Sequence, residues 1–200
     1  MATVLSTSST PRANRSERKY SVKSLINKLD RAMAFATVEK RVEATRAAVA
    51  EAATHADFLP QEFLQTNKET YARRPLHVDP AGRYSVLVMV WDKGQGTPLH
   101  DHGGLWVVEC LYRGRMQVTN YDYLGEEDGV HRFNPTTLEQ AVAGDTDYRI
   151  PPVEHHVVRN DLDSPSVTIH VFGGILDKCD VFEPVEGGYR KVAKTMAYTS

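Results

Sequence analysis

Two histidines, His100 and His102, stand one residue apart in the segment TPLHDHGG, between two apolar runs. On a β-strand, residues i and i+2 project from the same face, so both imidazoles can point at one metal ion while Asp101 points away. A pair of imidazoles suits Zn, Cu, Fe or Ni, and a useful site needs at least one more ligand. The question is therefore whether the chain supplies a third ligand.

A second histidine pair, His155 and His156, lies in the segment PPVEHHVVRN. Adjacent residues of a strand face opposite ways, so only one of the two is expected to reach a metal bound by the first pair. The residue types alone leave open which one it is. His55, His77 and His131 have no such neighbours in the sequence, and we expect them to be structural or exposed.

The elements that must position these histidines differ along the chain. Residues 1–16 are rich in Ser, Thr, Arg and Pro and are expected to form a disordered tail. In residues 17–60 apolar side chains recur every three and four positions, which predicts two or three helices that pack on the remainder. In residues 61–200 the period shortens to two, and we expect a single β domain there.

Seven candidate strands are separated by glycine and proline turn signals. They are Tyr84–Trp91, Leu105–Tyr112, Met116–Tyr123, Leu138–Val142, Tyr148–Ile150, His155–Arg159 and Val167–Phe172. Many short strands with turns between them are typical of an antiparallel sandwich or barrel. The predicted fold class is therefore mainly β, with α-helices at the N-terminus.

Composition excludes several classes of protein. The 200 residues carry a formal net charge of −2, which argues against nucleic-acid or membrane-surface partners. No run approaches the ~20 apolar residues of a membrane span, and no stretch resembles a signal peptide, so a cytoplasmic protein is expected. Cys110 and Cys179 lack zinc-type spacing and are interpreted as buried or bystander thiols. The oligomeric state is left open.

The glycines around the first pair carry a resemblance to a known family. Gly94 precedes His100 by six residues and Gly114 follows His102 by twelve, which resembles the first signature of the cupin superfamily. In that signature the glutamate ligand falls at Val107, so the usual carboxylate is missing at its position. The resemblance implies a cupin-type antiparallel β-sandwich or barrel, the jelly-roll.

The second pair fits the second cupin signature. Pro151, His156 and Asn160 have its spacing, although Val153 stands where a glycine is usual. This spacing favours His156 over His155 as the third ligand. The resemblance thus implies a metal site made of three histidines, His100, His102 and His156.

Within the cupins, a three-histidine site without glutamate is similar to that of the thiol dioxygenases, the family of cysteine dioxygenase and 3-mercaptopropionate dioxygenase. The segments RYSVLVMVWDKGQGTPLHDHGG, HHVVRN and SVTIHVFGG agree with it, and the resemblance covers roughly residues 71–174. It implies that Fe(II) binds the substrate thiolate and O2 and that both oxygen atoms pass to sulfur. The product would be a sulfinate, and no external reductant is implied.

The resemblance also implies roles for individual side chains. Tyr71 and Arg73 match the family's substrate-binding residues, and the planar guanidinium of Arg73 suits a carboxylate. The family's catalytic Ser-x-His-x-Tyr segment reads Thr168, His170, Phe172 here. Thr keeps the hydroxyl, but Phe cannot donate a hydrogen bond.

The phenylalanine is a departure from the family. Some members crosslink the tyrosine to a cysteine, and the corresponding positions here are Phe172 and Val107, so that crosslink cannot form. Cys110 is expected to face the opposite way from Val107. Either another group, such as Tyr121 or Tyr123, replaces the phenol, or the substrate needs none.

The expected activity is that of an oxidoreductase acting on a small carboxylate-bearing thiol: cysteine, 3-mercaptopropionate or mercaptosuccinate. Mercaptosuccinate fits the local surplus of arginine, with Arg73 joined by Arg74 or Arg159. Two alternatives stand beside this expectation. One is a cupin isomerase or decarboxylase that uses Mn or Zn, and the other is a cupin that binds a small acid without catalysis.

Overall fold

The computed structural model describes residues 20–199, so the tail predicted for residues 1–16 lies outside the described residues. Two helices come first, α1 (Val22–Ala32) and α2 (Val38–Ala53), followed by a short 3-10 helix, η1 (Gln61–Leu64). Ser21 and Thr37 cap the two α-helices by accepting hydrogen bonds from backbone N–H groups of the first turns. The predicted helices are thus present.

The β domain contains two antiparallel sheets. The first has five strands in the order β1-β2-β9-β4-β7, and the second is a closed barrel in the order β10-β11-β6-β5-β8-β3. The strands of the first are β1 (Ala72–Val78), β2 (Ser85–Trp91), β4 (Val107–Arg113), β7 (Thr146–Arg149) and β9 (Ser166–Phe172). The strands of the second are β3 (Leu99–His100), β5 (Arg115–Glu127), β6 (Val130–Val142), β8 (His156–Arg159), β10 (Lys178–Val185) and β11 (Gly188–Thr195).

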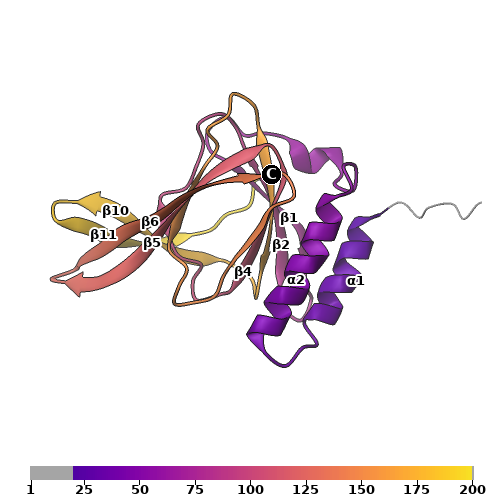
Figure 1. Ribbon diagram of the computed structural model, residues 1–200, viewed down its shortest axis with the longest axis horizontal. Coiled ribbons are helices and arrows are strands. Elements are labelled where there is room, and N and C mark those ends of the chain that lie inside the picture. The colour runs from indigo at the N-terminus through magenta and orange to yellow at the C-terminus, as the bar shows by residue number, and fades with distance from the viewer. Residues whose placement is uncertain (1–19, 200) are drawn as a thin grey trace, which may run out of the picture.

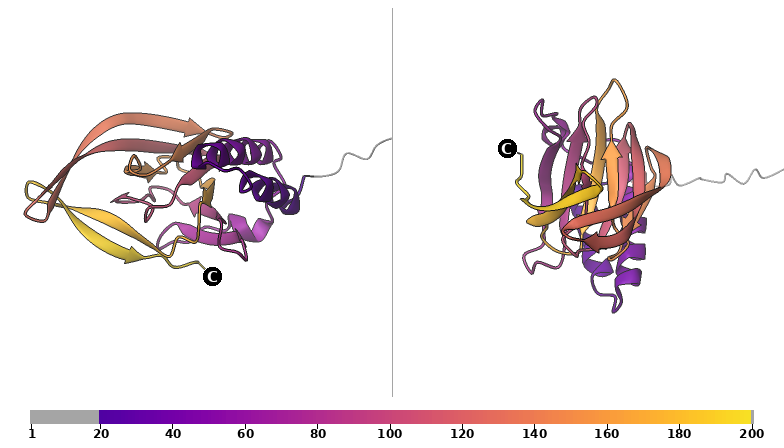
Figure 2. Two further views of the ribbon diagram at one scale, coloured as in Figure 1. Left: turned by 90° about the horizontal axis from the view of Figure 1, so that it is seen from below. Right: turned by 90° about the vertical axis from the view of Figure 1, so that its left-hand side faces the viewer.

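The helices and the long hairpins lie at opposite ends of the molecule. Helices α1 and α2 cover the outer side of the five-stranded sheet, whereas the hairpins β5–β6 and β10–β11 extend away from it (Figures 1 and 2). The predicted fold class, mainly β and antiparallel with N-terminal helices, is confirmed. None of the described helices is long and apolar enough to cross a membrane.

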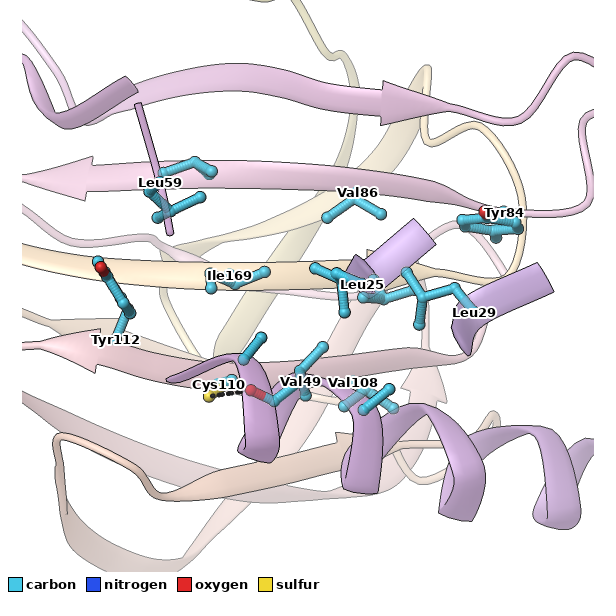
Figure 3. Close-up of a cluster of buried hydrophobic side chains, with 14 of the residues drawn as sticks. Leu25, Leu29, Val49, Leu59, Tyr84, Val86, Val108, Cys110, Tyr112 and Ile169 are labelled. Atoms are coloured by element: carbon cyan, nitrogen blue, oxygen red, sulfur yellow. Dashed lines mark hydrogen bonds between the residues drawn. The ribbon is translucent and has the colours of Figure 1, made fainter. Parts of the chain in front are cut away.

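Alternation along the strands gives the five-stranded sheet two different faces. On the outer face, Val108, Cys110 and Ile169 belong to a buried apolar cluster that includes Leu25 and Val49 of the helices (Figure 3). The next residues along the same strands, such as Val107 and Phe172, belong to a second cluster inside the β domain. Cys110 and Val107 thus face opposite ways, as predicted. The site lies on the inner side.

Four strands were not anticipated from the sequence: β1, β3, β10 and β11. Strand β3 has only two residues, too few for a periodic signal. Strands β10 and β11 form a hairpin whose outer half is exposed on both faces, so polar and apolar residues do not alternate cleanly. Strand β6 is also largely exposed, so its polarity does not alternate cleanly. The sequence therefore predicted only its last part, Leu138–Val142, whereas the strand begins at Val130.

Candidate metal centre

The three predicted histidines converge in the interior of the β domain. His100 lies on β3 and is the cross-strand partner of His156 on β8, while His102 follows β3 in the next loop. One ring nitrogen from each of the three lies within 4.8 Å of the other two, which is close enough for a shared metal ion. The ring centroids are 4.6 to 5.1 Å apart.

Oxygen atoms near the Nδ1 positions orient the rings. His100 Nδ1 lies 3.1 Å from the carbonyl oxygen of Pro98, and His156 Nδ1 lies 3.0 Å from that of Glu154. His102 Nδ1 is 3.6 Å from the carboxylate of Glu154, which is too far for a hydrogen bond, and it has no other partner among the described residues. If the Nδ1 atoms carry the protons, the Nε2 lone pairs are left for a metal. Metal-binding histidines usually donate their other ring N–H to a carbonyl or carboxylate oxygen.

Burial makes the three histidines suitable ligands. His102 and His156 are almost wholly inaccessible, and His156 Nε2 has no hydrogen-bond partner among the described residues. Burial and the neighbouring His156 lower the pKa of His100 to about 3, and the same causes hold the pKa of His102 well below its usual value. The neutral imidazoles, which can bind a metal, are thus favoured. A buried ring nitrogen without a hydrogen-bond partner, within a group of three histidines, fits a metal site.

The neighbouring residues Asp101 and His155 point elsewhere. The carboxylate of Asp101 accepts hydrogen bonds from the backbone N–H groups of Gly103 and Asp180, so it fastens the loop rather than serving the site. The ring of His155 lies among aromatic side chains, 5.0 Å from Phe133 and 5.3 Å from Phe182. Only His156 of the second pair belongs to the cluster of three.

A chain of polar side chains on the inner face of the five-stranded sheet faces the histidines. The indole N–H of Trp91 donates to Thr168 Oγ1 at 2.8 Å, and Thr168 Oγ1 lies 2.8 Å from His170 Nε2. His170 Nδ1 lies 3.1 Å from Glu109 Oε1. Because an indole only donates, the threonine hydroxyl is free to donate to His170 Nε2, which leaves the Nδ1 proton of His170 facing the carboxylate.

Glu109 was missed by sequence reasoning. Its Oε1 lies 3.6 Å from His156 Nε2. The valine at position 107 had suggested that no carboxylate lies near the three histidines, but Glu109 supplies one. Burial raises the pKa of Glu109, but the neighbouring side chains of His156 and His170 outweigh burial and hold that pKa well below its usual value. Strand parity is the signal that was available: Glu109 is two residues from Val107 and shares its face.

The two predicted substrate-binding residues are placed differently. Tyr71 stacks on Trp91 with ring centroids 4.4 Å apart and lines the same pocket as His100 and His102. Arg73 is buried beside an adjoining cavity that shares Tyr71 with this pocket. Its guanidinium donates to the carbonyl oxygen of Leu176 at 3.0 Å, and its Nε has no partner among the described residues.

The phenol of the pocket comes from Tyr71. Burial raises its pKa, so Tyr71 stays protonated and able to donate a hydrogen bond. Tyr121 and Tyr123, the replacements considered above, do not line this pocket, and the hydroxyl of Tyr123 lies 3.1 Å from His131 Nδ1 instead. The ring of Phe172 lies 6.0 Å from those of His102 and His170 and supplies an apolar wall.

Comparisons with known proteins agree with the resemblance seen in the sequence. No family model matches the chain. The chain is 24% identical to cysteine dioxygenase type 1 of Rattus norvegicus over 120 residues, 57% of this chain and 56% of that protein. It is 22% identical to the Danio rerio enzyme over 145 residues, 68% of this chain and 69% of that protein. The rat alignment thus spans little more than half the length of that relative.

Solved structures with a similar fold include a Klebsiella pneumoniae protein that has a double-stranded β-helix domain. Its TM-score is 0.46 at 15% identity, and the match covers 58% of this chain and 88% of that one. A Cupin 2 conserved barrel domain protein from Salinispora arenicola has a TM-score of 0.40, 19% identity and coverage of 57% and 83%. The chain is therefore similar to cysteine dioxygenases in sequence, has cupin barrels among its structural neighbours, and brings three histidines together in a possible metal site.

Proposed function

We propose that the protein is a non-haem, Fe(II)-dependent thiol dioxygenase that oxidises a small carboxylate-bearing thiol with O2 to the sulfinate. The single observation that supports this most is the convergence of three histidines, two of them buried, beside a hydrogen-bonded His170–Thr168 pair. The similarity to cysteine dioxygenases points the same way. Bound Fe(II) would supply adjacent coordination positions for a thiolate and O2.

The chain's own residues hold and orient the reactants. His100, His102 and His156 hold the metal through neutral nitrogens, and the pocket walls keep bulk water from the sulfur. His170 and Thr168 form the polar side of the pocket, and their mutual hydrogen bond fixes the imidazole ring. In the overall reaction the thiol loses one proton and its sulfur gains both atoms of O2, so no reductant is consumed.

Tyr71 and Arg73 are proposed to bind the carboxylate end of the substrate. Tyr71 can donate its hydroxyl proton within the pocket, and the unpartnered Nε of Arg73 is the donor that remains beside Tyr71. Arg74 and Arg159 are poorer candidates, because neither lines the pocket with the histidines or the adjoining cavity that Arg73 lines. Arg74 instead donates to the carbonyl oxygen of Gln65 at 2.5 Å.

A panel of thiols tests the proposal. Iron-loaded protein is given cysteine, 3-mercaptopropionate and mercaptosuccinate while O2 uptake is recorded, and products are weighed by mass spectrometry after turnover in labelled O2. We expect at least one thiol to yield a sulfinate that carries two labelled oxygen atoms. Serine, which lacks the sulfur of cysteine, is the control. Uptake no greater than with serine for every thiol would contradict the proposal.

One observation favours a second candidate, a cupin isomerase or decarboxylase that uses Mn or Zn. The carboxylate of Glu109 lies 3.6 Å from His156 Nε2, where a small movement would make it a fourth ligand. Against this, Glu109 already contacts His170 Nδ1 and is not part of the three-histidine group. Glu109→Ala discriminates: weakened metal binding favours the second candidate, whereas retained iron with slower thiol oxidation favours the first.

A further inference from the structure

Lys194 is the one lysine or arginine that lines the pocket shared by His100 and His102 within the described residues. It lies on β11, a strand that sequence reasoning did not anticipate. Arg73, the cation expected there, borders only the adjoining cavity, which Lys194 also lines. The position of Lys194 in the barrel therefore decides whether its ammonium group can serve the site.

Strand parity places Lys194 on the barrel-facing side of β11, where it lines the pocket while remaining exposed to solvent. Val192 and Met196, two residues before and after it, pack against the interior apolar cluster, and alternate residues of a strand share a face. Lys194 is also the cross-strand partner of Cys179, a buried residue of the same pocket.

Pairing along the barrel connects Lys194 with the histidines. Val192 is the partner of Val181, and Val181 is the partner of His100 on β3. Lys194 thus projects from the same barrel wall as His100, one inward position further along β11. Glu109, the carboxylate of the pocket, comes instead from the opposite sheet.

The charge of Lys194 is not neutralised by the chain. Lys194 forms no ion pair with any residue from 20 to 199, whereas Lys191 on the outer side of the same strand pairs with Asp180 at 3.3 Å. Arg73, by contrast, is already directed to the carbonyl oxygens of Leu176 and Ala197. Because most of the side chains that line the pocket are apolar, an anion that enters loses water and needs a charged partner.

We propose that Lys194 is a substrate-binding residue whose ammonium group pairs with the carboxylate of the thiol and thereby restricts the site to anionic thiols. This inference rests on the proposed function, because it assigns the carboxylate end of the same substrate. Tyr71 lies in the same pocket and donates a neutral hydrogen bond to that carboxylate. Arg73 lines the adjoining cavity together with Tyr71 and Lys194, and its charge acts on the carboxylate from there.

The test compares one thiol with and without a negative charge. The probes are 3-mercaptopropionate and its uncharged amide, 3-mercaptopropionamide, and the variant Lys194→Met keeps the apolar stem while removing the charge. We expect Lys194→Met to raise the KM for the carboxylate about 10- to 100-fold, the size of a charge-assisted hydrogen bond. The kcat and the KM for the amide should change little, and Lys194→Arg should restore part of the loss.

The matched control is Lys191→Met, which removes a lysine from the outer face of the same strand and should leave both KM values unchanged. A second measurement needs no turnover: zinc binds thiolates without redox chemistry, so calorimetry on zinc-loaded protein gives the affinity directly. We expect Lys194→Met to weaken binding of 3-mercaptopropionate by the same factor while binding of the amide is unaltered.

The outcomes separate the two proposals. If the wild-type protein oxidises 3-mercaptopropionate and Lys194→Met does so with an unaltered KM, Lys194 is not a substrate-binding residue, although the proposed function stands. An equal rise in KM for the carboxylate and the amide would also overturn the assignment, because it shows a loss of pocket shape rather than of charge. If iron-loaded protein oxidises no thiol, the proposed function fails, while the calorimetry still decides whether Lys194 binds the carboxylate.

Discussion

The two faces of the five-stranded sheet are made from the same strands and differ in chemistry. On β4 and β9 the outer face presents Val108, Cys110 and Ile169 to the helices, whereas the inner face presents Glu109 and His170. Placing ionisable groups in an interior costs free energy unless they are paired, and these two are each other's cross-strand partners. The outer face is therefore interpreted as serving stability and the inner face as serving a reaction.

The difference teaches that the outer cluster and the candidate site can be perturbed independently. Adjacent residues on one strand, such as Ile169 and His170, belong to different faces and should fail in different ways. Outer-face substitutions should alter the free energy of unfolding and leave metal content unchanged. Inner-face substitutions should alter metal binding or turnover while the fold persists.

The largest effect is expected from His156→Ala. His156 is one of the three clustered histidines, so its removal leaves two ligands and should abolish metal retention after purification. Elemental analysis of purified protein measures this. The matched control is His155→Ala, which changes the neighbouring residue on the opposite face and should leave metal content intact. If metal is lost from His155→Ala and kept by His156→Ala, the third ligand is His155 and the site has been assigned wrongly.

The next largest effect is expected from His170→Ala. The imidazole faces the pocket but is not one of the three clustered histidines, so metal should stay bound while turnover falls about 10²- to 10⁴-fold. Thr168→Val sharpens the assignment, because it removes only the hydroxyl that contacts His170 Nε2 and should lower kcat less. Steady-state O2 uptake and metal analysis measure the two properties. Loss of metal from His170→Ala would make His170 a ligand instead.

The sequence was sufficient to predict the three histidines and the inner face of β9. His100 and His102 could be predicted as a pair from their spacing, although only His100 lies on a strand, and His156 was favoured over His155 by the resemblance to the second cupin signature. Thr168 and His170 were predicted from the resemblance to the thiol dioxygenases, and alternation along β9 places both on its inner face. Their hydrogen bond at 2.8 Å agrees with that reading.

Glu109 and Lys194 could not be found in this way because both depend on pairing between strands distant in sequence. Glu109 becomes relevant only when β4 is placed beside β9, so that it opposes His170. Lys194 becomes relevant only when β11 and β10 close the barrel against β3. Strand β11 itself gave a weak signal because its exposed residues do not alternate in polarity.

A smaller effect is expected from Ile169→Val on the outer face. Ile169 is fully buried against the helical layer, and removing one methylene group there should lower the free energy of unfolding by about 0.5–1.5 kcal/mol. Urea denaturation measures the change (Figure 3 shows the cluster). Metal content and kcat should match those of the wild-type protein. A reduced kcat with unaltered stability would show that the two faces are not independent.

The smallest effect on the free energy of unfolding at neutral pH is expected from Cys110→Ala. At alkaline pH the wild-type protein should lose stability relative to this variant. Burial, with a smaller contribution from Asp145, raises the pKa of the Cys110 thiol from 9.0 to about 12. A raised folded-state pKa means that the contribution to stability is complete below pH 9.0 and is lost as pH rises through about 12, because the unfolded chain releases the proton first. Over that window the wild-type protein should lose roughly 1 kcal/mol per pH unit more than Cys110→Ala, since one pKa unit corresponds to about 1.4 kcal/mol. Urea denaturation at a series of alkaline pH values measures both slopes. Parallel slopes would show that the thiol is not held protonated between the sheet and the helices, and the outer face would then be less dry than its apolar composition indicates.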